Sequence, residues 1–231
     1  MGIQPCSVSR PSTSGVSQDP QDQISLRIAE NPALANKDAI TSGRTWIEGE
    51  PFRQHVYTYG YAILNDDALA LTREVTASVG HKVLSLFTGL GYAEAQMVAR
   101  GMDVIGFERE VPENRWLRNT HEGPGEMSFS RFGDRALFLS FPDPTKRDIG
   151  GSAPVSFINR FLEAGGSTVI TINEARPREH AIKCDQALIE LLGQGRCVGE
   201  VALPAWPAVM CFVGRGNTHS DFRPVLKVHQ F

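Results

Sequence analysis

The chain has 231 residues, of which 41% are hydrophobic and 21% charged, and its formal net charge is -3 at pH 7. This length and composition are typical of one globular domain, alone or with a tail, that buries its own core. The mild acidity disfavours general binding to nucleic acid. No run reaches the roughly 18 apolar residues that a transmembrane helix needs.

The first 50 residues divide into two parts by composition. Residues 1–23 are rich in Ser, Pro and Gln and nearly free of large apolar groups, so we expect a disordered tail. Residues 24–50 hold scattered apolar positions, which predict a partly ordered lead-in. The ordered domain is expected to span 51–231.

The expected elements of that domain follow in chain order. An extended aromatic stretch over 55–64 precedes a helix with Asn65 or Asp66 as its N-cap, running to about Ser78. Short apolar runs then alternate with helix-forming segments. Strands are predicted at 82–87, 103–107, 136–141 and 167–173, and helices at 93–100, 155–164 and 184–192. Residues 111–133 are predicted to be irregular, and 197–203 with 209–213 to form an antiparallel pair.

Strands that alternate with helices predict an α/β fold, a Rossmann-like, doubly wound and mainly parallel sheet with a terminal antiparallel strand pair. In such sheets, ligands bind beyond the carboxyl ends of the strands, where the strand order switches direction. The candidate site residues all lie at these expected strand ends.

The first candidate is the turn Thr88, Gly89 and Gly91, directly after a buried strand. Glycines there let the backbone approach a ligand closely, and the following helix presents free N–H groups. Glu94 stands where the dinucleotide fingerprint has its third glycine, so the turn suits a nucleoside better than a pyrophosphate. A tight turn without any ligand is the alternative.

The second candidate is Glu108, at the end of the second strand. A carboxylate at this position can accept hydrogen bonds from both hydroxyls of a ribose. The alternative is a solvated acid paired with Arg109 or Arg100.

Two further strand ends carry polar residues. Pro142 and Asp143 form a stiff lip, where Asp143 would orient a substrate or act as a general base, or simply leave the strand. Glu174 and Arg176 would contact substrate, or form a surface ion pair. The histidines have no partner at metal-ligand spacing, so no metal is expected. Four cysteines without a C-x-x-C pair are typical of reduced, mostly buried thiols in the cytoplasm.

The order of these motifs resembles class I S-adenosylmethionine-dependent methyltransferases, and more closely a little-characterised bacterial group of methyltransferase-like proteins. The resemblance covers about Tyr57 to Val213. Its motifs are an aromatic strip (57–61), a strand with a Gly-rich turn (83–92), a strand ending in an acid followed by proline (107–112), an Asp-Arg-Ala-Leu strand with a proline lip (134–142), a Gly-Gly strand ending in Glu (165–174) and a Leu-Pro-x-Trp-Pro turn (203–207).

The resemblance implies S-adenosylmethionine as cofactor and methyl transfer to an unknown acceptor, a small molecule or a protein. Tyr61 and Thr88 would line the cofactor site, Gly89 and Gly91 would lie near its methionine part, and Glu108 would hold the ribose.

The sequence departs from the family pattern at two positions of the turn. Ser85 replaces the acid expected to bind the cofactor's amino group, and Phe87 replaces the first glycine, so that its ring would reach cofactor space. These departures motivate a second hypothesis, a catalytically inactive domain that binds a protein. An NAD(P) oxidoreductase is disfavoured by the missing third glycine.

The N-terminal tail offers a separate source of function. Gly2 and Cys6 partly match a signal for double lipidation, which would anchor the chain to a membrane. The Ser/Pro-rich head also resembles the leader of a type III secreted effector, which would be translocated into a host cell. An ordinary disordered tail on a cytoplasmic protein is the alternative.

Overall fold

The computed structural model describes residues 62–113, 115–123, 127–142, 147–148, 151–174, 186–203 and 224–231. The tail, the lead-in and the aromatic strip that ends at Tyr61 lie outside these residues. The same holds for the expected strand at 209–213 and the turn at 204–207.

Among the described residues, seven strands form one sheet in the order β3-β2-β1-β4-β7-β9-β8. They are β1 (Lys82–Leu86), β2 (Asp103–Glu108), β3 (Thr120–Glu122), β4 (Ala136–Ser140), β7 (Thr168–Glu174), β8 (Arg196–Ala202) and β9 (Pro224–Gln230). The helices are α5 (Asp66–Val75), α6 (Tyr92–Ala99), α7 (Ala153–Glu163) and α8 (Gln186–Gln194). Short 3-10 turns, η1 (Ala77–Val79) and η3 (Phe129–Arg131), and a small ribbon of β5 (Arg147–Asp148) with β6 (Gly151–Ser152) complete the described elements.

The sheet confirms the predicted fold class. β3, β2, β1, β4 and β7 pair in parallel, whereas β9 runs antiparallel to both β7 and β8. The terminal antiparallel pair is therefore present, and Arg196–Ala202 is one of its members. Its partner is Pro224–Gln230, a segment for which the sequence analysis predicted no strand.

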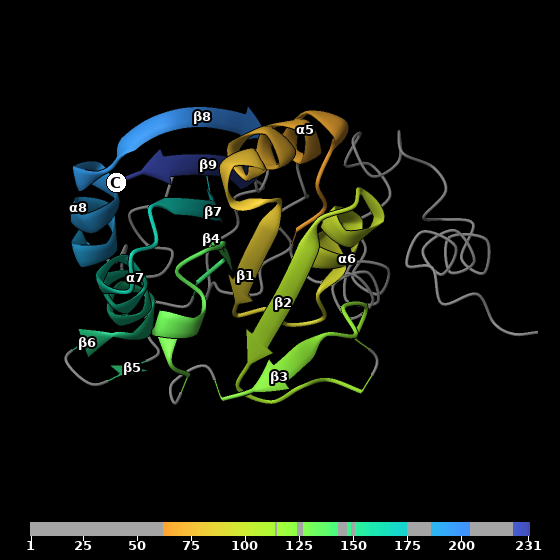
Figure 1. Ribbon diagram of the computed structural model, residues 1–231, viewed down its shortest axis with the longest axis horizontal. Helices are drawn as coiled ribbons and strands as arrows, with labels where there is room; N and C mark the ends of the chain where they lie inside the picture. Colours follow the sequence, from red (N-terminus) through yellow and green to blue (C-terminus); the bar gives the residue numbers. More distant parts are fainter. Residues whose placement is uncertain are drawn as a thin grey trace, which may run out of the picture.

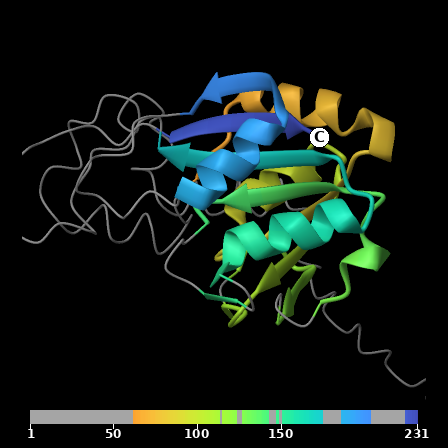
Figure 2. The ribbon, with the colours of Figure 1, turned by 90° about the vertical axis from the view of Figure 1, so that its left-hand side faces the viewer.

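Helices cover both faces of the sheet, as a doubly wound fold requires. One core cluster packs the sheet against α5 and α6, and the other packs it against α7 and α8. Figure 2 shows α7 and α8 crossing the face of the sheet turned to the viewer, with α5 behind the strands; Figure 1 shows the same layers from a view turned by 90°.

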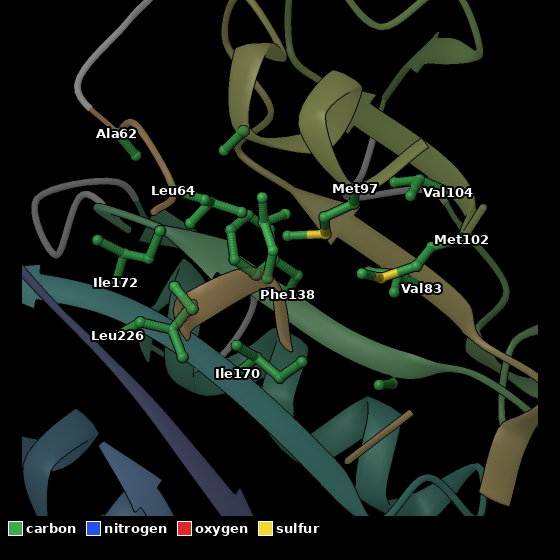
Figure 3. Close-up of a cluster of buried hydrophobic side chains, with 14 of the residues drawn as sticks. Ala62, Leu64, Val83, Met97, Met102, Val104, Phe138, Ile170, Ile172 and Leu226 are labelled. Carbon is green, nitrogen blue, oxygen red and sulfur yellow. The ribbon is translucent and has the colours of Figure 1, made fainter. Parts of the chain in front are cut away.

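Alternation along the central strands assigns side chains to these two layers. In β4, Phe138 points into the α5/α6 cluster, whereas Leu137 and Leu139 point into the α7/α8 cluster. Figure 3 shows the Phe138 ring at the centre of the first cluster, with Leu64 and Met97 beside it. Both faces of β4 are thus buried, which explains why its sequence is an unbroken apolar run.

The first helix begins where the sequence predicts. The side chain of Asn65 accepts a hydrogen bond from the backbone N–H of Ala68 at 2.9 Å, which is an N-cap. The same side chain donates to the carbonyl of Ala202 at 3.0 Å, so it also joins α5 to β8. The helix is shorter than expected because η1 follows it and ends at Gly80, whose φ of 65° is left-handed.

We expect Asn65→Ala to lower the free energy of unfolding by about 1 to 2 kcal/mol, because it removes the cap and the bond to Ala202 together. Asn65→Asp keeps the acceptor for Ala68 and loses only the donor, so it should lose less. Urea unfolding of both variants measures the difference. Equal losses would show that the cap contributes nothing.

Within the described residues, no helix is long and apolar enough to cross a membrane, and no three His, Cys, Asp or Glu side chains gather as a metal site. Cys197 is the one cysteine among the described residues, and it is exposed rather than buried. β3 and η3 lie in the segment that was expected to be irregular.

Candidate functional site

The strand order makes the carboxyl ends of β1 and β4 the expected place for a ligand. The chain proceeds from β1 to β2 and β3 on one side and then crosses to β4 on the other, so the order switches between β1 and β4. Leu86, the last residue of β1, pairs with Phe107 of β2 and Leu139 of β4. The segments that follow these three residues therefore emerge at one edge of the sheet.

At this edge the structure brings together the two leading candidates, the glycine turn and Glu108. The backbone N–H of Gly89 donates to Oε2 of Glu108 at 2.7 Å, and the N–H of Arg109 donates to Oε1 at 2.8 Å. Each carboxylate oxygen can accept a second hydrogen bond. Glu108 is therefore fixed in position by two backbone amides and keeps free acceptor capacity. In the described structure Glu108 forms no ion pair with Arg109 or Arg100; Arg100 pairs with Asp66.

The two glycines of the turn have different roles. Both have left-handed backbones, with φ of 54° at Gly89 and 72° at Gly91. A Cβ on Gly91 would lie 2.7 Å from Cβ of Leu117, so Gly91 is needed for close packing. At Gly89 no described atom lies within 4 Å of the corresponding point. Open space thus adjoins Gly89, the glycine whose N–H is hydrogen-bonded to Glu108.

Phe87, at the position where the resemblance expects a glycine, has a left-handed backbone. Its φ is 59°, in the left-handed region that costs a residue with a side chain about 1 to 2 kcal/mol. Its ring packs against the α7/α8 cluster, with its centroid 5.7 Å from that of Phe157 on α7. The ring is therefore turned towards the core under the turn.

The segment after β2 closes over the other side of the turn. Leu90 accepts a backbone hydrogen bond from Trp116 at 2.6 Å, and the hydroxyl of Thr88 donates to the carbonyl of Phe107 at 3.1 Å. Thr88 is buried, so its hydroxyl holds the turn against β2. The contacts made by Trp116 and Leu117 were not predicted, because their segment has neither helical nor strand periodicity.

A buried pair beneath the turn was also missed by the sequence analysis. The hydroxyl of Ser85 in β1 donates to Oε1 of Glu94 in the first turn of α6 at 2.6 Å, and both residues are buried. The pKa of Glu94 is raised to about 7, mainly by burial and to a smaller extent by the charge of Glu108, against the lowering effects of the Ser85 hydrogen bond and of its own backbone amide. Position 85 lacks the expected acid, but a carboxyl from the next helix lies against it.

The remaining candidates are only partly placed. Pro142 is buried and directly follows Phe141, which has a φ of 48° and donates its N–H to the carbonyl of Ile172. Glu174 is the last residue of β7, and β4 separates that strand from β1. The spacing of neighbouring strands puts β7 about 10 Å from β1. Asp143, Arg176 and Tyr61 lie outside the described residues.

No protein-family model matches the chain, and no curated protein matches it in sequence. Many solved structures resemble its fold. One is the magnesium protoporphyrin IX methyltransferase from Synechocystis with bound SAM, at a TM-score of 0.39 and 11% identity over 85% of this chain and 99% of that one.

Two further methyltransferases resemble the fold of this chain to a similar degree. A putative caffeoyl-CoA O-methyltransferase from Staphylococcus aureus has a TM-score of 0.42 and 12% identity, over 89% of this chain and 99% of that one. The mitomycin 7-O-methyltransferase MmcR has a TM-score of 0.43 and 12% identity, over 92% of this chain and 68% of that one. A likeness this distant does not establish function.

Proposed function

We propose that the protein binds S-adenosylmethionine at the carboxyl ends of β1 and β2 and transfers its methyl group to an acceptor. The observation that carries the proposal is the hydrogen bond between Gly89, which follows β1, and Glu108, which ends β2, beside the switch point between β1 and β4. This hydrogen bond joins the glycine turn, which has open space beside Gly89, to the carboxylate of Glu108, whose oxygens can still accept further hydrogen bonds.

The residues of the site fit a nucleoside better than a phosphate. Glu108 supplies two oriented carboxylate oxygens, which match the two hydroxyls of a ribose and would repel a phosphate. The open position at Gly89 admits a ligand close to the backbone. In this proposal Gly89 faces the ligand, and Gly91 and Thr88 hold the turn in shape.

S-adenosylmethionine supplies an activated methyl group on a sulfonium sulfur. Transfer breaks the bond between sulfur and methyl and forms one to the acceptor's nucleophile, which gives up its proton. The protein would mainly position the two partners and exclude water. We propose Pro142 and Asp143 for the acceptor side, with Asp143 orienting the nucleophile or taking its proton, Glu174 and Arg176 for further acceptor contacts, and Tyr61 for the cofactor.

Titration calorimetry with S-adenosylhomocysteine, with NADP as the control ligand, tests this proposal. We expect micromolar binding of S-adenosylhomocysteine and none of NADP. A chain that binds neither compound would rule the proposal out, and one that binds only NADP would assign the turn to a dinucleotide instead.

A second candidate function is a methyltransferase-like domain that no longer catalyses transfer and binds a protein. One observation favours it: Phe87, with a φ of 59°, stands where the family has a glycine. A translocated effector, a lipid anchor at Gly2 and Cys6, and a cytoplasmic location all remain proposals that rest on the sequence.

Phe87→Gly separates the two candidates. The variant loses the ring contact with Phe157 but relieves the left-handed backbone, so we expect stability to change by no more than about 1 kcal/mol. Because the ring is turned towards the core, affinity for S-adenosylhomocysteine should change less than threefold. A gain of tenfold or more, measured by calorimetry, would show that the ring occupies cofactor space.

A further inference from the structure

The Ser85–Glu94 pair places an ionisable carboxyl beneath the proposed cofactor site. Glu94 is 1% exposed, and its carboxyl accepts the hydroxyl hydrogen bond of Ser85 in the strand that leads into the turn. α6 begins at Tyr92, with Gly91 as its N-cap, so Glu94 lies in the first turn of that helix. The pair therefore links β1 to α6, and residues 87–91 form the turn between them.

The surroundings of Glu94 give it few ways to balance a negative charge. Among the described residues, the groups that act on its carboxyl are the Ser85 hydroxyl on β1, its own backbone amide on α6 and the charge of Glu108 at the end of β2. Burial excludes the water that would screen a charge at this position. An ionised Glu94 thus adds a second negative charge next to that of Glu108, with no described cation beside it.

We propose that Glu94 is a specificity-determining residue that favours a ligand with a positive charge over the turn, and so distinguishes the sulfonium cofactor from its neutral thioether product. The inference rests on the proposed function. Methyl transfer converts a sulfonium into a thioether, and the two compounds share their amino, carboxyl and nucleoside groups. A buried carboxylate would attract the first more than the second.

The titration of Glu94 makes this selectivity depend on pH. Its carboxyl is largely neutral at pH 6 and largely ionised at pH 8, because burial raises its pKa to about 7. Binding of a cation favours the ionised form, so it should drive release of a proton near pH 7, whereas the thioether should drive less. The groups common to both ligands contribute equally to both and cancel in the ratio of affinities.

The experiment measures the affinities of S-adenosylmethionine and S-adenosylhomocysteine by calorimetry at pH 6 and pH 8. We expect the preference for the sulfonium compound to increase by about fivefold between the two pH values. Repeating the titrations at pH 7 in buffers with different ionisation enthalpies should show extra proton release for that compound. Glu94→Gln should remove both effects, and Glu74→Gln, an exposed change on α5, should keep them.

Three results would overturn the inference. A preference that does not change with pH in the wild-type protein, or one that still changes in Glu94→Gln, would assign no role to Glu94 while leaving the proposed function in place. If neither compound binds at pH 6 or at pH 8, the proposed function and this inference are overturned together.

Discussion

Glu108→Ala should lower the affinity for S-adenosylhomocysteine by more than about 100-fold while the protein stays folded. In the proposed complex Glu108 accepts two hydrogen bonds from the ribose, and each bond to a charged group contributes about 1.5 to 3 kcal/mol. The side chain is only partly buried, and its intramolecular partners are two backbone amides at the edge of the sheet. We expect the loss of stability to stay below about 2 kcal/mol.

Two matched variants make this result specific. Glu108→Gln keeps the size of the side chain and one acceptor oxygen, so its affinity should lie between those of the wild type and Glu108→Ala. Glu110→Ala removes an exposed acid two residues away and should bind as the wild type does. Calorimetry measures binding, and circular dichroism with urea unfolding measures the fold. Unchanged affinity in a folded Glu108→Ala protein would remove the ribose assignment.

The free energy of unfolding of the wild-type protein should fall by about 3 kcal/mol as pH rises from 4.5 to 8, and Glu94→Gln should remove this fall. The pKa of Glu94 is raised from 4.5 to about 7, mainly by burial. Between these values the unfolded chain releases the proton and the folded chain retains it, so the free energy of unfolding falls with rising pH. The fall is complete above pH 7, and it amounts to about 1.4 kcal/mol for each pH unit between the pKa values of the unfolded and folded chains.

Urea unfolding at pH 4.5 and pH 8 gives the quantity to compare, the difference in free energy of unfolding between Glu94→Gln and the wild type. This difference should change by about 3 kcal/mol in favour of the variant at the higher pH. A constant cost of the buried amide cancels in the comparison. For Glu74→Gln, on the exposed surface of α5, it should change by less than about 0.5 kcal/mol. A change of less than about 0.5 kcal/mol in Glu94→Gln would mean that the pKa of the Glu94 carboxyl is not raised in the folded protein.

Local signals in the sequence predicted the central fold correctly. The apolar run from Lys82 to Phe87 and the one from Ala136 to Phe141 are the central strands β1 and β4, because strands buried on both faces need apolar residues throughout. Asn65 marks the start of α5 through the cap that its side chain forms.

Features that depend on distant parts of the chain were not predicted. Pro224–Gln230 looks like a short C-terminal stretch until β7 and β8 are placed on either side of it. The hydrogen bond of Ser85 to Glu94 requires a particular rotation of α6 over β1, and no residue pattern encodes that rotation. Gly89 and Glu108 were each assigned to the carboxyl end of a strand, where parallel sheets bind their ligands, but the hydrogen bond that joins them was not predicted.

The position of β9 has a consequence for how the chain folds as it is synthesised. Within the described residues, β8 joins the sheet only through β9, which is made after it and lies between β8 and β7. A growing chain can assemble β1, β2, β4 and β7 with their helices in order of synthesis. Until β9 has been synthesised and inserts between β7 and β8, the edge of β7 stays unpaired and can pair with a wrong strand, and β8 has no neighbour in the described sheet.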